Sequence, residues 1–258
     1  MAWTKTKTVV LVGAILVAVA AAAVIKWGLS PAVKDSYFQT SYMRFQTVPK
    51  NLLVVRPTHF TDGTVNFVAS TSPKPGQNVL RMMGRDVSLE QVVAAAYGAN
   101  VSRIVPPLLK PKNNFDYLVT VPDRQQERFQ AAIKKKLGYT AHWEDRDTDV
   151  LLLETTSPDP PGFTLSKTGN PGVSGQNGKY WFTHMRLSSI VGFLEYTSRQ
   201  PVLDRTGLTN YYNFSIEMNW RGTNGPNREQ LETQLGYMGL KLEPATESVR
   251  MLIVEKTR

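Results

Sequence analysis

The sequence predicts an α/β (α+β) protein in which two tandem copies of one small module follow an N-terminal transmembrane helix. Three observations support this architecture. The same succession of helix and strand patterns occurs twice, both second helices end on a leucine-glycine-tyrosine triplet, and one long apolar stretch lies near the N-terminus. Each module is expected to run strand, helix, strand, strand, helix, strand, strand, so the halves are copies of one unit rather than parts of one large domain.

Apolar residues at positions i, i+3, i+4 and i+7 predict the first helix of each module. This spacing places the apolar side chains on one face of a helix, which then packs against other elements. The residues are Leu89, Val92, Val93 and Ala96 in the first copy and Leu187, Ile190, Val191 and Leu194 in the second. Runs at 115–121 and 212–218, which alternate or are continuously apolar, then predict one strand in each copy.

The second helix of each module has matching start and stop signals. Asp123 and Asn227 can each accept a hydrogen bond from a free amide of the first helical turn. At the other end, Gly138 and Gly236 stand where many helices need a residue in the left-handed conformation.

A β-hairpin is expected after each of these helices. Its strands would be Thr140–Trp143 and Val150–Glu154 in the first copy, and Leu240–Glu243 and Arg250–Glu255 in the second. The charged segment Glu144–Asp149 would then form a solvated hairpin turn.

The chain is expected to divide into five regions. Residues 156–177 are rich in proline and glycine, which predicts a linker. The other regions are a membrane anchor or signal peptide at 1–30, a stalk with leading strands at 31–75, module copy 1 at 76–155 and module copy 2 at 178–258.

The apolar stretch Val9–Ile25 predicts a single membrane-spanning helix. Its length of about 25 Å as a helix is near the lower limit for crossing a bilayer. Lys5 and Lys7 precede it without an acidic residue, so the N-terminus should stay in the cytoplasm. We expect a single-pass inner-membrane protein with the bulk of the chain periplasmic. A cleaved signal peptide is the alternative, because Ala20–Ala23 offers small residues to a peptidase.

The chain is basic, with a formal net charge of +9 and a pI near 9.7. Such a balance favours anionic partners such as nucleic acid, phospholipid head groups or acidic polymers. The basic residues are scattered, however, and the one run, Lys134–Lys136, ends a predicted helix, where cations interact favourably with the helix dipole. We therefore predict no nucleic-acid partner. The absence of cysteine excludes disulfides.

The second half of the chain resembles a known family. The residues that carry the resemblance are Gln200–Thr209, Tyr212–Phe214, Gln230–Leu235, Leu240–Ala245 and Met251–Val254. Leu89–Gly98 is similar to the family's first helix and Leu52–Pro57 to its opening strand. Over about Leu52 to Arg258 the chain is thus similar to an uncharacterised exported family, of the domain-of-unknown-function 3738 type, which occurs in many paralogous copies in soil acidobacteria and verrucomicrobia. Ile104–Leu108 departs from the family's pattern. The resemblance implies export and architecture, and no catalytic residue.

Four residues are candidates for contact with a ligand or partner: Asp204, Arg205, Trp181 and Trp220. Asp204 and Arg205 precede Gly207 in a predicted turn, where a carboxylate often accepts hydrogen bonds from the turn's own amides instead. The two tryptophans could line a recognition groove, although aromatic residues at strand ends more often belong to the core.

The sequence predicts no catalytic residue, no cofactor and no metal site. The three histidines, His59, His142 and His184, are far apart along the chain, so a metal site would need all three to be brought together by the fold. Asp145, Asp147 and Asp149 alternate as in the start of a calcium loop, but the later positions of that loop do not match. The triplet 167–169, Lys-Thr-Gly, matches one motif of serine-based penicillin-recognising enzymes, whose companion Ser-x-x-Lys is missing.

These observations favour a membrane-anchored envelope protein that binds a protein or an extracellular polymer and catalyses no reaction. The alternative is a hydrolase or transferase that acts on envelope material, with His142 or His184 as base and a carboxylate from Asp145–Asp149 or Asp204. A third hypothesis is a sensor that signals through the anchor, which the short cytoplasmic segment disfavours.

Overall fold

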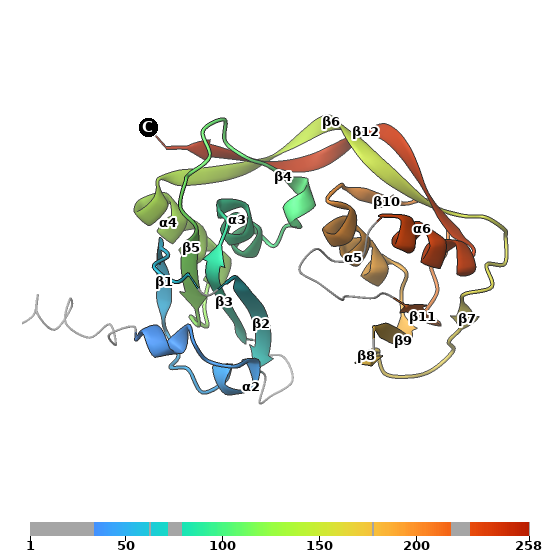
Figure 1. The fold of residues 1–258 in the computed structure, drawn as a ribbon, viewed down its shortest axis with the longest axis horizontal. Helices are drawn as coiled ribbons and strands as arrows, with labels where there is room; N and C mark the ends of the chain where they lie inside the picture. The colour runs from blue at the N-terminus through green and yellow to red at the C-terminus, as the bar shows by residue number, and fades with distance from the viewer. Residues whose placement is uncertain (1–33, 62, 72–78, 177, 218–227, 258) are drawn as a thin grey trace, which may run out of the picture. The chain divides into compact units, whose positions relative to one another are not determined.

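The computed structural model describes residues 34–257, except for 62, 72–78, 177 and 218–227 (Figure 1). These residues form a mixed α/β structure with three four-stranded sheets, which confirms the predicted fold class. They make two compact units that interleave along the chain: the first holds the residues up to 88 together with 112–137, and the second holds 89–111 and the chain from 138 onwards.

The predicted anchor, Val9–Ile25, lies outside the described residues. Among the helices that the structure does describe, none combines the length and the apolar character needed to cross a bilayer.

The first unit is an antiparallel sheet with one long helix and two short ones. Its strands in spatial order are β1 (Leu53–Pro57), β5 (Phe115–Val119), β3 (Val79–Val87) and β2 (Val65–Thr71). Its helices are the 3₁₀ helix η1 (Asp35–Tyr37), α2 (Tyr42–Phe45) and α4 (Gln125–Leu137).

Both faces of this sheet are covered at β5, whose five residues are all buried. On one face Tyr117 contacts Phe129 of α4, with ring centroids 5.2 Å apart. On the other face Leu118 packs with Phe38 and Phe45. Covering on both sides explains why Tyr117, Leu118 and Val119 of β5 are apolar in succession instead of alternating with polar residues.

Residues 35–52, part of the region expected to form a stalk, contribute to this core. Arg81 of β3 is buried and donates hydrogen bonds to the carbonyl groups of Phe45 and Val48. Burial lowers the pKa of the Arg81 guanidinium. The side chain therefore satisfies carbonyl groups at the end of α2 and fixes this segment on the sheet.

The second unit contains two sheets. The first is β10 (Val202–Asp204), β6 (Tyr139–Thr155), β12 (Leu240–Lys256) and β4 (Ile104–Val105), and the second is β7 (Thr164–Leu165), β11 (Tyr212–Glu217), β9 (Lys179–Met185) and β8 (Gly172–Gln176). The helices are α3 (Leu89–Tyr97), η2 (Val101–Arg103), α5 (Ser188–Ser198) and α6 (Arg228–Tyr237). The segment 156–177, expected to be a linker, thus also supplies the short strands β7 and β8.

The predicted terminal hairpins are wrong. β6 and β12 are each one continuous strand of 17 residues, and they pair with each other antiparallel from end to end. The expected turn Glu144–Asp149 lies in the middle of β6. It contains no glycine or asparagine, the residues that adopt the positive φ of a tight hairpin turn, so the strand continues and takes its partner from the other half of the chain.

Each long strand also receives a short parallel strand from the other half of the chain. β10 pairs with β6 beginning at Leu151, and β4 pairs with β12 beginning at Leu252. Leu151 is twelve residues after the start of β6, and Leu252 is twelve residues after the start of β12. The α-helices and strands follow the same order from β3 to β6 and from β9 to β12. In each half this order is strand, helix, short strand, strand, helix and long strand.

The predicted first helices are confirmed, and one of the two predicted stops is wrong. Gly138 follows α4 with a φ of 74°, as expected. Gly236 lies inside α6, and the left-handed residue is Gly239, with a φ of 77°. A Cβ at Gly239 would lie 2.6 Å from Cδ of Pro161, so both backbone angle and space require glycine there.

Candidate functional site

The second sheet of the second unit buries one face and exposes the other. Tyr180 and Phe182 of β9 pack with the core that α5 and α6 cover, and the Phe182 ring stacks on Phe214 of β11 with centroids 4.6 Å apart. Because side chains alternate along a strand, Lys179 and Trp181 lie on the opposite face. The Trp181 side chain is 39% exposed there.

Trp181 is surrounded on this outer face by small polar residues. In the strand register its direct neighbours are Ser174 of β8 and Ser215 of β11. The amino group of Lys179 lies 5.7 Å from the indole centroid. An indole that remains exposed among hydroxyl groups offers both an apolar platform and hydrogen-bond partners to a ligand.

A distortion of β9 gathers a second set of side chains at the end of the same sheet. His184 has a φ of 49°, and the pairing of β9 with β11 shifts register at this point. The His184 ring stacks on Tyr211, with centroids 4.4 Å apart and planes at 4°. The guanidinium of Arg186 lies 5.0 Å from the same Tyr211 ring. A left-handed backbone is uncommon for histidine and places its ring where a regular strand would not.

His184 also contacts a serine that sequence reasoning missed. Its Nδ1 lies 3.1 Å from Oγ of Ser166, which is only 9% exposed. Ser166 directly precedes the Lys-Thr-Gly triplet, and a Cβ at Gly169 would lie 3.3 Å from Cβ of His184. The triplet therefore forms a close turn beside the histidine. The residues that make this pair are 18 positions apart, so their spacing gave no signal.

The structure places Asp204 at the end of β10 and Arg205 in the turn that follows it. Oδ1 of Asp204 accepts hydrogen bonds from the amide of Thr206 at 3.0 Å and from its hydroxyl at 2.6 Å. Arg205 is half-exposed, and its Nη2 lies 3.5 Å from Oε2 of Glu247 on β12. The Asp204 carboxylate thus caps the turn, and Gly207 adopts a φ of 71° there.

The remaining sequence candidates are dispersed. Trp220 lies outside the described residues. His142 is an exposed residue of β6, 3.7 Å from Glu144, whose pKa is lowered mainly by a hydrogen bond from Arg146. His142 and His184 belong to different sheets. No group of three histidine, aspartate or glutamate side chains suited to a metal ion occurs within the part of the chain that the structure describes.

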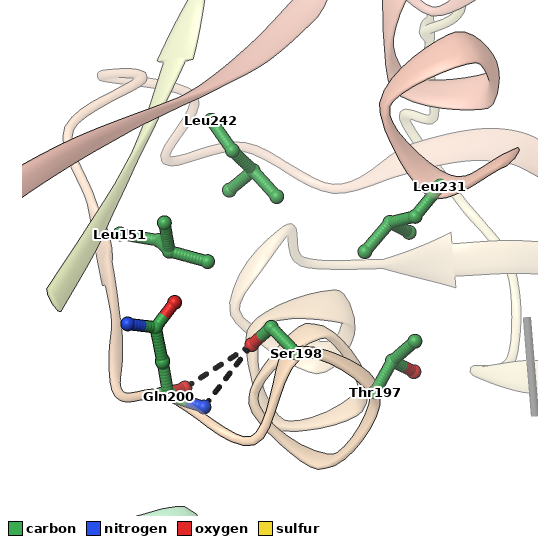
Figure 2. Close-up of a pocket in the computed structure, with 6 residues that line it drawn as sticks. All are labelled: Leu151, Thr197, Ser198, Gln200, Leu231 and Leu242. Carbon is green, nitrogen blue, oxygen red and sulfur yellow. Dashed lines mark hydrogen bonds between the residues drawn. The ribbon is translucent and has the colours of Figure 1, made fainter. Parts of the chain in front are cut away.

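A small cavity lies between α5, α6 and the long strands in the second unit (Figure 2). It has a volume of about 90 Å³ and is lined by the side chains of Leu151, Leu231 and Leu242, with Thr197, Ser198 and Gln200 at its edge. The Ser198 hydroxyl already donates to backbone carbonyls, including that of Gln200. The cavity is smaller than sites for drug-sized ligands, which span about 300–1,000 Å³.

Comparison with known proteins identifies one family. Residues 90–257 match the family described as "Protein of unknown function (DUF3738)". No curated protein and no solved structure matches the chain.

Proposed function

Because the chain belongs to the DUF3738 family of proteins of unknown function, we propose a function from its own geometry: a non-enzymatic binding protein of the cell envelope. In this proposal Val9–Ile25 anchors it in the inner membrane and the rest of the chain lies in the periplasm. Its two halves, which share one order of elements, descend from a duplicated module whose long strands have exchanged partners.

The observation that carries this proposal is the exposure of Trp181 on a polar sheet face. A pyranose ring has a face of C–H groups, which contacts an indole, and a rim of hydroxyl groups, which bond to polar side chains. Ser174 and Ser215 flank the indole on neighbouring strands and supply such partners. We therefore propose that the ligand is a glycan polymer of the envelope.

Glycan binding is tested by sedimentation of the full chain, in detergent, with insoluble peptidoglycan and with chitin. Trp181→Ala should weaken binding by about tenfold or more, because it removes the aromatic anchor of the site. Trp143→Ala is the matched control, since Trp143 of β6 also has a cation over its ring, Arg250 at 5.7 Å, but lies in the other sheet. Equal binding by the two variants, or no sedimentation of the wild type with either polymer, would refute the proposal.

A second candidate function is hydrolysis, and the 3.1 Å contact between Ser166 and His184 favours it. In this scheme Nδ1 takes the hydroxyl proton while Oγ attacks an acyl carbon, and the proton passes to the leaving group as its bond to that carbon breaks. Water then cleaves the acyl-serine ester and restores the hydroxyl group. Stacking on Tyr211 would hold the imidazole ring in place.

A fluorophosphonate probe separates the two functions. In a serine hydrolase the Ser166 oxygen displaces fluoride from phosphorus, which mass spectrometry detects as an adduct on that residue. Ser166→Ala and His184→Ala should then remain unlabelled, whereas Ser189→Ala, at an exposed serine of α5, should be labelled. An unlabelled wild type would exclude this second function and leave the binding proposal intact.

A further inference from the structure

Two adjacent leucines protrude from the second unit. Leu108 and Leu109 have relative exposures of 104% and 82%, above those of the other large apolar residues in the described part of the chain. Single exposed leucines are ordinary on protein surfaces. Two consecutive leucines that make so little contact with their own chain indicate a surface that meets an apolar partner.

The loop that presents these leucines is held on both sides. Before it, Val105 of β4 pairs with Ile253 of β12. Pro106, Pro107 and Pro111 restrict the backbone because each fixes φ. After the leucines, the amino group of Lys110 lies 3.0 Å from a carboxylate oxygen of Glu90 on α3. The leucines are therefore displayed by a stiff loop and do not need to be ordered on binding.

The segment that carries the leucines is basic in sequence, although Glu90 of α3 pairs with Lys110 and offsets its charge. No acidic residue occurs in the sequence between Glu90 and Asp116, whereas Lys110 and Lys112 directly follow the leucines. The chain as a whole carries a formal net charge of +9. Exposed leucines next to lysines are complementary to a surface with negative charges on the outside and an apolar layer below them.

The small size of the feature favours a lipid bilayer over a folded partner. A stable protein interface covers about 800 Å² on each side, far more than two leucines supply. A bilayer, in contrast, accepts individual apolar side chains below the head groups, while lysine ammonium groups stay at the level of the phosphates. We propose that the Leu108–Leu109 loop inserts into the surface of an anionic lipid bilayer.

The inference is separate from glycan binding and uses the proposed membrane anchor only for proximity. Two inserted side chains bind a bilayer weakly and reversibly by themselves. A chain that is already tethered to the same membrane has a high effective concentration at its surface. Even weak contacts with the bilayer then form for much of the time. Insertion would then fix how the second unit faces the membrane.

The absence of cysteine allows one label to be placed on this loop. Leu109→Cys, carrying the polarity-sensitive dye nitrobenzoxadiazole, is reconstituted as the full chain in vesicles of phosphatidylcholine alone or with about 30% phosphatidylglycerol. Insertion predicts an emission about twofold or more stronger in the anionic vesicles, and quenching by doxyl-labelled lipid. Leu108→Ser in the same labelled chain should reduce both effects.

Val173→Cys is the matched control, because Val173 is also an exposed apolar residue of the second unit, at 55%, on β8. Its label should remain in water in both vesicles. Emission at position 109 that stays water-like in anionic vesicles, or that rises equally at position 173, would overturn the inference. If the emission at position 109 rises in detergent without lipid, and the rise depends on protein concentration, the leucines contact a second copy of the chain and not a bilayer. That result would also overturn the inference. Leu109→Cys should sediment with peptidoglycan as the wild type does, whichever of these results is obtained. Failure of the bilayer proposal can therefore be distinguished from failure of the glycan proposal.

Discussion

Arg103 and the buried Glu195 form a partly buried ion pair in the second unit, with Nε of Arg103 donating to Oε1 of Glu195 at 2.7 Å. The same carboxylate oxygen accepts from the amide of Val202 at 3.1 Å. The pair joins η2, which follows α3, to α5 and to the start of β10. It therefore links segments from the two halves of the sequence inside one unit.

Arg103→Ala should destabilise the protein by about 3 kcal/mol, because it leaves the Glu195 carboxylate buried without a charged partner. Urea unfolding followed by circular dichroism measures this loss. The exposed pair Arg146 and Glu144 is the control, and Arg146→Ala should change stability by less than about 1 kcal/mol. Similar losses for the two variants would show that burial does not set the strength of the Arg103 pair.

The proposed equivalence of the two long strands predicts that two core truncations each cost several kcal/mol, within about 2–5 kcal/mol. Leu151→Ala and Leu252→Ala each remove a leucine that is at most 2% exposed, where a short parallel strand joins β6 or β12. Urea unfolding measures both losses. The loss at Leu151 should be the smaller of the two, since Leu151 already lines a cavity. A negligible effect at either leucine would contradict the proposed equivalence of the strands.

Gly192→Ala should stabilise the protein by about 0.5–1 kcal/mol, because Gly192 lies within α5 and a Cβ there would meet nothing within 4 Å. The carbonyl of Gly192, which accepts from Asn100, is retained. The melting temperature should therefore rise. Gly162→Ala is the contrasting variant, because a Cβ at this position would lie 2.5 Å from Cα of Met238. This substitution should lower the melting temperature. A fall for both variants would mean that α5 does not accept a side chain at this position.

The acid stability of the first unit should depend on Asp35. A hydrogen bond from Arg56 lowers the pKa of this exposed carboxyl, and a contact with His59 acts in the same direction. A folded-state pKa below the unfolded value contributes stability that is complete above the unfolded pKa of about 3.9 and is lost as the pH falls through the folded pKa. The difference in melting temperature between wild type and Asp35→Asn should thus be positive at neutral pH and vanish in acid. A difference independent of pH would exclude this linkage.

Local features of the fold could be predicted where one segment contains all the information. Leu89 and Val92 of α3, and Ile190 and Leu194 of α5, are buried because side chains three or four residues apart lie on the same face of a helix. Asp204 accepts from an amide of its own turn, as its composition indicated, and also from the Thr206 hydroxyl. These interactions span a few residues and do not depend on distant partners.

The partners of the strands could not be predicted in this way. Glu144–Asp149 is as compatible with a polar turn as with the exposed centre of a long strand, and only the presence of β12 decides between them. The Ser166–His184 contact likewise depends on the register shift in β9 and on the turn at Gly169. Neither has a periodic signal along the chain.

Composition, residue periodicity and motifs were enough to predict the α/β class, the positions of the main helices, the basic charge and the family. Tertiary structure alone decided that β6 pairs with β12 instead of folding back, that Trp181 faces outwards, and that Leu108 and Leu109 are left uncovered. The physical reason is that strand pairing and exposure are set by free energies of contact between residues far apart in the chain, whereas periodicity records only which side chains of one segment share a face.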